Sequence, residues 1–326
     1  MPDPRRRPTR RRFLQTFGLS ALFAGMLGSY AAAIEPLYRL NTTRYRLRPA
    51  GWPRGLDLRI AVIADLHACR PWMDEARIAQ VVTRTNALAP DLVLLLGDFV
   101  SGLKAPFVRT QMPAEIWAEA LAKLQAPLGR YAVLGNHDWW DDAAGQWLGR
   151  GPTPAQAALE RVGIPVLENT CLRLTHKESV FWLAGLGDQM ALLPGGGGSG
   201  RRGRGRDDLP GTLRQITDDA PIILMAHEPD IFPQVVRAPR PVSLTLSGHT
   251  HGGQVRAFGY APVVPSRFRN RYAYGHKVEV APDGTPRDLV VSGGLGCSIA
   301  PVRFGVPPEI LLLTLGARDD SEMQVT

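Results

Sequence analysis

Five short clusters of polar side chains along the 326-residue sequence could bind metal ions. Each follows an apolar run, and in order they read Asp65-Leu66-His67, Gly97-Asp98, Gly135-Asn136-His137-Asp138, Ala226-His227-Glu228 and Gly248-His249-Thr250-His251. Five of the seven histidines lie in these clusters, and only His176 and His276 lie elsewhere. Carboxylate, imidazole and carboxamide ligands without a thiolate suit divalent metals such as Mn, Fe, Zn or Mg.

Taken singly, the clusters have simpler explanations. An Asp-x-His after a strand is typical of a turn and cap, Gly-Asp is a turn signal, and a lone buried histidine is usually a hydrogen-bonded core residue. Turn chemistry alone does not account for five clusters that each end an apolar run. Seven ligand groups exceed the need of one four-coordinate metal, whereas two metals sharing a carboxylate would use them. Two ions about 3.5–4 Å apart can stabilise both the attacking and the leaving oxygen of an in-line displacement, which indicates phosphoester hydrolysis.

The apolar runs before the clusters are typical of strands buried on both faces. They span residues 58–64, 92–96, 131–134, 222–225 and 242–246, and a further run spans 289–291. Ligand sites in α/β sheets lie outside the carboxyl ends of the strands, so five strands would aim their polar residues at one edge. Shorter strands are predicted at 166–167, 172–174 and 180–183.

Helices are predicted between the strands. The spacing of apolar residues predicts one helix over residues 74–89 with Asp74 as its cap, one that starts at Pro113, and one over 155–162 that Gly163 ends. This alternation of strands and helices predicts βαβ units and an α/β fold.

The order D-x-H, G-D, G-N-H-D, a strand-terminal H and G-H-T-H resembles the calcineurin-like metallophosphoesterases over about residues 56–315. The resemblance implies an α/β sandwich of two mixed β-sheets flanked by helices, with a dimetal site at the carboxyl ends of the strands. It implies that one metal is held by Asp65, His67 and His251. It implies that the other is held by Asn136, His227 and His249, with Asp98 as the bridge.

The resemblance also assigns roles beyond the metal ligands. His137 would contact the phosphate and either protonate the leaving group or stabilise charge. A metal-bridging hydroxide would be the nucleophile, so a Ser or Cys nucleophile is not required. Apart from the resemblance, the position of Asp138 next to His137 predicts that it orients a metal ligand by a hydrogen bond or else caps a helix. By their place after this motif, Trp139 and Trp140 would line an apolar substrate cleft or pack a helix against the sheet.

Two further segments resemble the membrane-associated branch of this family. They are Gly252-Gly253-Gln254 and the stretch from Gly294-Leu295-Gly296 to Arg303-Phe304-Gly305. Part of that branch is assigned as UDP-2,3-diacylglucosamine hydrolase in lipid A synthesis, which suggests a lipid-linked or UDP-sugar-lipid substrate. That reaction is cytoplasmic, whereas the N-terminal segment described next points outward. Arg303 is either a ligand of the substrate phosphate or a surface arginine.

The N-terminus carries an export signal. Residues 5–12 are rich in arginine, the stretch from Phe13 to Ile34 is apolar and uncharged, and Ala31-Ala32-Ala33 offers a cleavage site after Ala33. Thr9 to Gln15 resembles the twin-arginine motif, with Arg10 and Arg11 as the pair, which would make the twin-arginine export machinery a partner. An uncleaved membrane anchor is the alternative, since 22 apolar residues can span a bilayer.

Residues 34–326 are predicted to form one metallophosphoesterase domain. A cleaved signal would leave this domain free in the periplasm, and an uncleaved anchor would hold it at the periplasmic face of a bacterial cytoplasmic membrane. Residues 1–33 would be the signal or the anchor. Within the domain, residues 194–208 are rich in Gly and Arg and predict a flexible loop.

Composition and charge exclude several classes of protein. With 44% hydrophobic and 21% charged residues, the chain is neither disordered nor a multi-span membrane protein. A net charge of +8 could indicate a nucleic-acid partner, but six arginines against one aspartate in residues 1–33 supply +5 of it. No nucleic-acid partner is therefore expected. Three scattered cysteines without a CxxC indicate neither a disulfide framework nor a thiolate zinc site.

Three functions remain after these exclusions. The best supported is a dinuclear metal-dependent phosphoric ester hydrolase that acts on a phosphomonoester, a phosphodiester or a pyrophosphate. The alternatives are a non-catalytic metal-binding scaffold on the same fold and a nucleic-acid phosphodiesterase. Since scaffolds of this kind usually lose ligands, the presence of His137 and of all seven ligand residues favours the enzyme.

Overall fold

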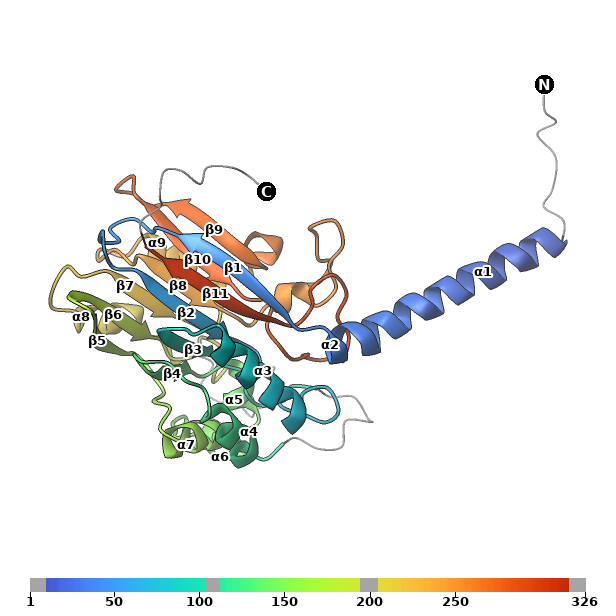
Figure 1. Ribbon diagram of the computed structural model, residues 1–326, viewed down its shortest axis with the longest axis horizontal. Helices are drawn as coiled ribbons and strands as arrows, with labels where there is room; N and C mark the ends of the chain where they lie inside the picture. Colours follow the sequence, from blue (N-terminus) through green and yellow to red (C-terminus); the bar gives the residue numbers. More distant parts are fainter. Residues whose placement is uncertain (1–9, 104–111, 194–204, 317–326) are drawn as a thin grey trace, which may run out of the picture.

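Two mixed β-sheets form the centre of the fold in our computed structural model (Figure 1). The structure describes residues 10–103, 112–193 and 205–316, with side chains from residue 14 onward. Helices flank the pair of sheets, so the predicted α/β sandwich is confirmed. Residues 194–204 of the predicted Gly/Arg-rich loop, residues 1–9 and the side chains of Arg10 and Arg11 lie outside the described part.

The first sheet places three parallel strands side by side. Its order is β1 (Asn41–Leu47), β11 (Glu309–Leu315), β2 (Leu58–Ile63), β3 (Leu92–Leu96) and β4 (Arg130–Val133). β2, β3 and β4 are parallel, whereas β11 runs antiparallel to β2 and parallel to β1. The carboxyl ends of β2, β3 and β4 therefore lie at the same edge of this sheet.

The second sheet repeats this arrangement with four parallel strands. Its order is β5 (Thr170–His176), β6 (Ser179–Gly185), β7 (Ile222–Met225), β8 (Leu244–Ser247), β10 (Pro286–Val291) and β9 (Gly275–Val280). β6, β7, β8 and β10 are parallel, and the antiparallel strands β5 and β9 form the two borders.

Apolar side chains from both sheets share one buried cluster, which includes Ile60 and Val62 of β2 and Leu244 and Leu246 of β8. Complete burial of one such side chain contributes about 1.5–3 kcal/mol to folding, so this cluster holds the two sheets against each other. The outer face of the first sheet packs with α3 (Glu75–Ala87), α4 (Ala114–Leu121) and α7 (Pro154–Arg161). The outer face of the second packs with α8 (Leu209–Arg214) and α9 (Phe232–Val236).

The predicted helix over 74–89 illustrates why these segments become helical. The Asp74 side chain accepts a hydrogen bond from the Arg77 backbone N at 2.8 Å, which satisfies an otherwise free donor of the first turn. Ile78 and Val81 lie on the buried face of α3, which packs against the first sheet. α3 ends before Ala89, because the left-handed φ of 46° at Ala89 is incompatible with a continuing α-helix.

Most predicted elements are present, and one is not. Residues 166–167 form no strand, because Val166 pairs with the chain only through an isolated bridge to Ala132 beside β4. The strands β1, β9 and β11 were not predicted from the sequence. β1 and β9 lie at sheet borders and carry half-exposed polar residues, so they lack a continuous apolar run.

The N-terminal helix α1 (Arg10–Ser29) projects away from the sandwich (Figure 1). A π-helical turn (Tyr30–Ile34) and the short α2 (Glu35–Tyr38) connect it to β1. The segment Leu14–Tyr38 has a mean hydropathy of 1.6 and is long enough to cross a bilayer. A signal sequence near the N-terminus has the same properties, so the helix is a weak indication of membrane association.

Candidate active site

The five polar clusters follow five strands that end at one edge of the sandwich. Asp65 lies just after β2, Asp98 after β3 and Asn136 after β4, while His227 follows β7 and His249 follows β8. The three strands of the first sheet are parallel, as are the two of the second. Their carboxyl ends bring side chains far apart in the sequence to one place, as the clusters predicted.

The backbone around these residues is strained. Left-handed φ angles, between 44° and 67°, occur at Asp65, His67, Asp98, His249 and His251. Such angles are uncommon for residues other than glycine and cost about 1–3 kcal/mol each when the surroundings impose them. They turn the side chains toward one another immediately after the strands end.

A first group of ligand atoms comes from Asp65, His67, Asp98 and His251, and all of them lie within 4.8 Å of one another. His67 Nε2 is 3.1 Å from His251 Nε2 and 3.5 Å from Asp98 Oδ2. His251 Nε2 is 3.6 Å from Asp65 Oδ1. Two imidazoles and two carboxylates that converge in this way could hold one divalent cation.

A second group shares Asp98 with the first. Ligand atoms of Asp98, His227 and His249 lie within 4.8 Å of one another. His227 Nε2 is 3.2 Å from Asp98 Oδ2, and His249 Nδ1 is 2.9 Å from Asn136 Oδ1. The carboxamide oxygen of Asn136 thereby joins this group. The seven residues named from the sequence are thus gathered into two adjoining sets.

The carboxylate of Asp98 faces both sets. Its Oδ1 accepts a hydrogen bond from the His137 backbone N at 2.8 Å, which fixes the plane of the group. Its Oδ2 is the atom that approaches both His67 and His227. This geometry is what a bridging carboxylate needs.

Two buried atoms of the site indicate that it is built for cations. Within the site, Asp65 Oδ2 and His227 Nε2 are buried and make no hydrogen bond of acceptable geometry, the latter although it lies 3.2 Å from Asp98 Oδ2. Leaving a buried polar group unsatisfied costs about 1–3 kcal/mol. A divalent ion in each set would satisfy both atoms, so the residues present fit two such ions.

The histidines of the first set are held in the neutral form that a metal requires. Burial lowers the pKa of His67 to about 3. Burial also lowers the pKa of His251 well below its usual value, and His67 and Arg303 lower it further. Burial alone would raise the pKa of Asp98, but His227 and His137 outweigh it and hold that pKa well below the usual range.

Backbone carbonyls orient two of the imidazoles from behind. His67 Nδ1 lies 2.9 Å from the Val100 carbonyl oxygen, and His227 Nδ1 lies 2.6 Å from that of Leu96. A carbonyl at this position accepts the Nδ1 proton, which leaves the Nε2 lone pair free for a metal.

Arg303 lies behind the imidazole of His251 and is shielded from solvent. Its side chain is fully buried, and its guanidinium donates to the carbonyls of Gly296, Gly293 and Val306 at 2.8–2.9 Å. Nη2 is 3.2 Å from His251 Nδ1. The alternative of a surface arginine is therefore wrong, and a guanidinium committed in this way is placed to support His251 instead of a substrate phosphate.

Asp138 combines the two roles considered for it. Its Oδ2 accepts from the backbone N of Asp98 and of Gly135, each at 2.9 Å. Its Oδ1 accepts from the backbone N of Phe99 and Val100, at 2.9 and 3.0 Å. Asp138 caps the start of α5 (Asn136–Trp140) and also fixes the loop that carries Asp98.

His137 lies at the border of the two sets and is slightly exposed. Its Nε2 is 3.3 Å from Ser298 Oγ, and its Nδ1 is 3.8 Å from Asp141 Oδ2. Burial lowers its pKa, but Asp98 and Asp141 raise it by more, so the net shift is upward. A raised pKa keeps more of the imidazole protonated near neutral pH, which suits a general acid.

Several neighbours of His137 were not identified from the sequence. Ser298 belongs to a loop far along the chain, and no local signal marked it. A side chain on Gly102 would overlap the His137 ring, so only glycine allows this close approach. Of the two tryptophans, Trp139 is buried in the core, whereas the Trp140 ring lies 5.3 Å from that of His137.

Acidic groups also lie beside the second set. Asp188 and Glu228 are buried next to His227, and their ligand atoms lie within 4.8 Å of it and of each other. Glu228 Oε2 accepts from the Gln189 backbone N at 3.1 Å. Glu228 belongs to one of the five polar clusters of the sequence, but no role was predicted for it.

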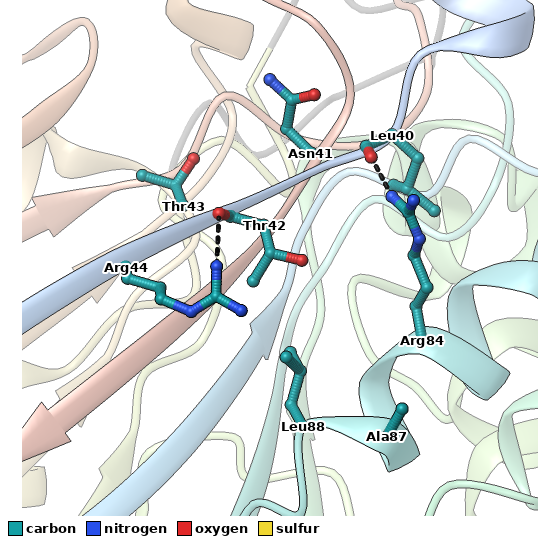
Figure 2. A pocket seen from close by; sticks show the side chains of 8 residues that line it. All are labelled: Leu40, Asn41, Thr42, Thr43, Arg44, Arg84, Ala87 and Leu88. Atoms are coloured by element: carbon teal, nitrogen blue, oxygen red, sulfur yellow. Dashed lines mark hydrogen bonds between the residues drawn. The ribbon is translucent and has the colours of Figure 1, made fainter.

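An open pocket of about 530 Å³ lies between β1 and α3, away from these groups, and none of the ligand residues lines it (Figure 2).

Comparison with known proteins agrees with this geometry. Residues 58–253 match the family model for calcineurin-like phosphoesterase. An uncharacterized metallophosphoesterase of Bacillus subtilis is 30% identical over 94% of this chain and 97% of its own length. A UDP-2,3-diacylglucosamine pyrophosphatase of Chlamydia muridarum is 26% identical over 91% and 96%. A transmembrane protein with a metallophosphoesterase domain from Danio rerio is 30% identical over 62% and 42%.

Replacing the shared carboxylate should affect both sets at once. We expect the Mn-loaded protein to contain close to two equivalents of metal and Asp98→Asn to lower occupancy at both positions. Asp65→Asn is the matched control and should lower occupancy at one, because Asp65 belongs to the first set alone. Metal analysis of protein dialysed against Mn²⁺ measures this. A single equivalent in the wild type at saturating metal would contradict the bridging role of Asp98.

Removing the His137 imidazole should impair turnover without loss of metal or fold. General acid catalysis contributes about 10²–10⁴-fold, so His137→Ala should lose that much on an ester with a poor leaving group and less on a p-nitrophenyl ester. Since the acid must be protonated, wild-type activity should fall as pH rises through the raised pKa of His137, and the variant should lack this limb. Equal losses for good and poor leaving groups would restrict His137 to charge stabilisation.

Proposed function

The chain belongs to the calcineurin-like phosphoesterase family and is a metal-dependent phosphoester hydrolase, and on that premise we propose that its substrate is a phosphodiester or pyrophosphate attached to a lipid. The observation that carries this proposal is the contact between the base of the N-terminal apolar helix and the loop at the site. Ala31 accepts a hydrogen bond from Arg303, on the loop whose Ser298 contacts His137. The similarity to a pyrophosphatase named for a diacylated sugar nucleotide supports the same substrate class.

We propose that each residue of the site has one task in this reaction. One ion would be held by Asp65, His67, Asp98 and His251, and the other by Asp98, Asn136, His227 and His249. When bound, two divalent ions supply charge neutralisation for the phosphate and an activated water, and Mn, Fe, Zn or Mg would suit these ligands.

The side chains of the protein supply the proton and hold the ligand residues in position. Protonated His137 binds a phosphoryl oxygen or gives its proton to the leaving oxygen, and Asp141 keeps its ring in place. Asp138 and Arg303 hold Asp98 and His251 in position and do not touch the substrate. The burial of the ligands excludes bulk water from the reacting phosphate, which strengthens these electrostatic interactions.

A substrate panel tests the lipid link. Using the full chain loaded with Mn²⁺ in detergent, we expect kcat/KM for a UDP-linked diacylglucosamine to exceed that for the same headgroup without acyl chains by about 100-fold, which equals about 2.7 kcal/mol. Burial of three or four methylene groups would account for this difference. Bis-p-nitrophenyl phosphate and p-nitrophenyl phosphate separate diesterase from monoesterase activity. Equal rates with and without acyl chains, or a preference for single-stranded DNA, would contradict the proposal.

We further propose that the protein is exported through the twin-arginine pathway and kept at the outer face of the membrane by α1. Lysine does not reproduce the guanidinium fork, so Arg10→Lys with Arg11→Lys should leave folded protein in the cytoplasm. The wild type should fractionate with the membrane and keep residues 13–34 by mass spectrometry, because the carbonyls of Ala31 and Ala32 bond to the domain. Normal export of the double variant would contradict the twin-arginine pathway. A mature protein that begins at Ile34 would contradict the retention of α1 as an anchor.

A further inference from the structure

Large apolar side chains are exposed on two loops beside the site. Phe258 is fully exposed, and Tyr260, Val263 and Ile299 are 63%, 73% and 75% exposed. We call these four residues the apolar rim. Soluble surfaces seldom gather such residues, and where they do the patch usually binds something.

The loops that carry the rim are tied to each other. Gln254 Nε2 donates to the carbonyls of Ala300 and Val302, and Gln254 Oε1 accepts from the Ser298 backbone N. The Arg256 backbone N donates to the Phe304 carbonyl at 2.7 Å. Because Ser298 also lies against His137, the rim and the catalytic histidine belong to one connected unit.

The same unit is joined to the base of α1. The Arg303 backbone N donates to the Ala31 carbonyl at 2.8 Å, and the ring of Tyr30 packs edge-on against Phe304. The buried carboxylate of Glu35 accepts from the backbone N of Gly305 and Val306 at 3.1 and 2.8 Å. The apolar helix therefore leaves the domain beside the rim, on the side where the loops around α2 gather in Figure 1.

Positive charge lies at the same border. The pocket between β1 and α3 begins at Leu40, two residues beyond the end of α2, and Arg44 and Arg84 point into it (Figure 2). Arg84 donates to the Leu40 carbonyl, which holds its guanidinium near the point where the helix enters the domain. None of the eight residues that line this pocket is acidic. Cations next to an apolar surface suit the headgroups of anionic lipids.

We propose that the apolar rim lies in the surface of the bilayer that α1 crosses, so that the mouth of the site opens onto lipid headgroups. The occupant is the bilayer because the loop that carries Phe258 is bonded to Phe304, and Phe304 packs against Tyr30 at the base of the apolar helix α1. The docking itself is independent of the reaction, and its use in delivering a lipid-linked phosphoester rests on the proposed function.

Depth measurement tests the docking directly. The full chain carrying Cys171→Ser is placed in nanodiscs of phosphatidylethanolamine and phosphatidylglycerol, and a nitroxide is attached at Phe258→Cys. Cys69 and Cys297 are buried and should not react. The matched control is Val280→Cys, since Val280 is 69% exposed and pairs with Pro286 at the end of β10 away from the site. We expect the label at 258 to be more accessible to oxygen than to a nickel chelate, and the label at 280 to show the reverse. Equal, water-like accessibility at both positions would overturn the proposal.

A turnover measurement separates the docking from the substrate. Phe258→Ser with Tyr260→Ser should slow hydrolysis of the lipid-linked substrate in nanodiscs by about tenfold, which equals about 1.4 kcal/mol, whereas Val280→Ser should not. Hydrolysis of bis-p-nitrophenyl phosphate serves as the control for fold and metal content. An inserted label with no lipid hydrolysis by the wild type would uphold the docking and contradict the proposed substrate. Lipid hydrolysis with a label in water would contradict the docking alone.

Discussion

The carboxylate of Asp98 lies among imidazole groups at the edge of two sheets, and the rest of the site depends on holding it there. One oxygen is fixed by the His137 backbone N, and the other faces His67 and His227 together. A buried charge is tolerable only when partners surround it on all sides. The His137 backbone N and the imidazoles provide these partners, while Asp138 fixes the backbone of the Asp98 loop to the start of α5. The strained φ angles at the ligands are stabilised by the same rigid edge.

Much of this arrangement could be predicted from the sequence, because it depends on local patterns. Continuous apolar runs predict β2, β3 and β7, and the polar residues directly after these runs are the ones that the structure brings together. The prediction failed where the determinant is tertiary. An arginine such as Arg303 reads as a surface residue or a phosphate ligand, and only the carbonyls of distant loop residues explain its burial. Border strands such as β1 carry polar residues on a half-exposed face and leave no apolar run to detect. β11, by contrast, has the apolar run Ile310–Leu313 and could have been predicted.

The connection between the site and the N-terminal segment also depends on contacts that no local pattern reveals. Glu35 reads as a polar residue that ends an apolar stretch, yet it is buried and bonded to the backbone of the loop after Arg303. The segment that follows α1 is therefore packed as part of the domain and not as a loose tether. This packing fixes the direction in which the helix leaves the domain relative to the mouth of the site.

The two sets of ligands are not equivalent, and the cause lies behind the imidazoles. A carbonyl behind His67 or His227 accepts the Nδ1 proton and strengthens the donor character of Nε2. His251 instead has the guanidinium of Arg303 behind it, and a guanidinium only donates. A ring that accepts at Nδ1 carries its proton on Nε2, so Nε2 must give up that proton before it can bind a cation, and the nearby positive charge of Arg303 disfavours the cation further. The first set, which contains His251, should for this reason hold its ion less tightly than the second. Arg303 would therefore influence the first set through His251, and it does so without reaching the substrate, because its guanidinium is bonded to loop carbonyls.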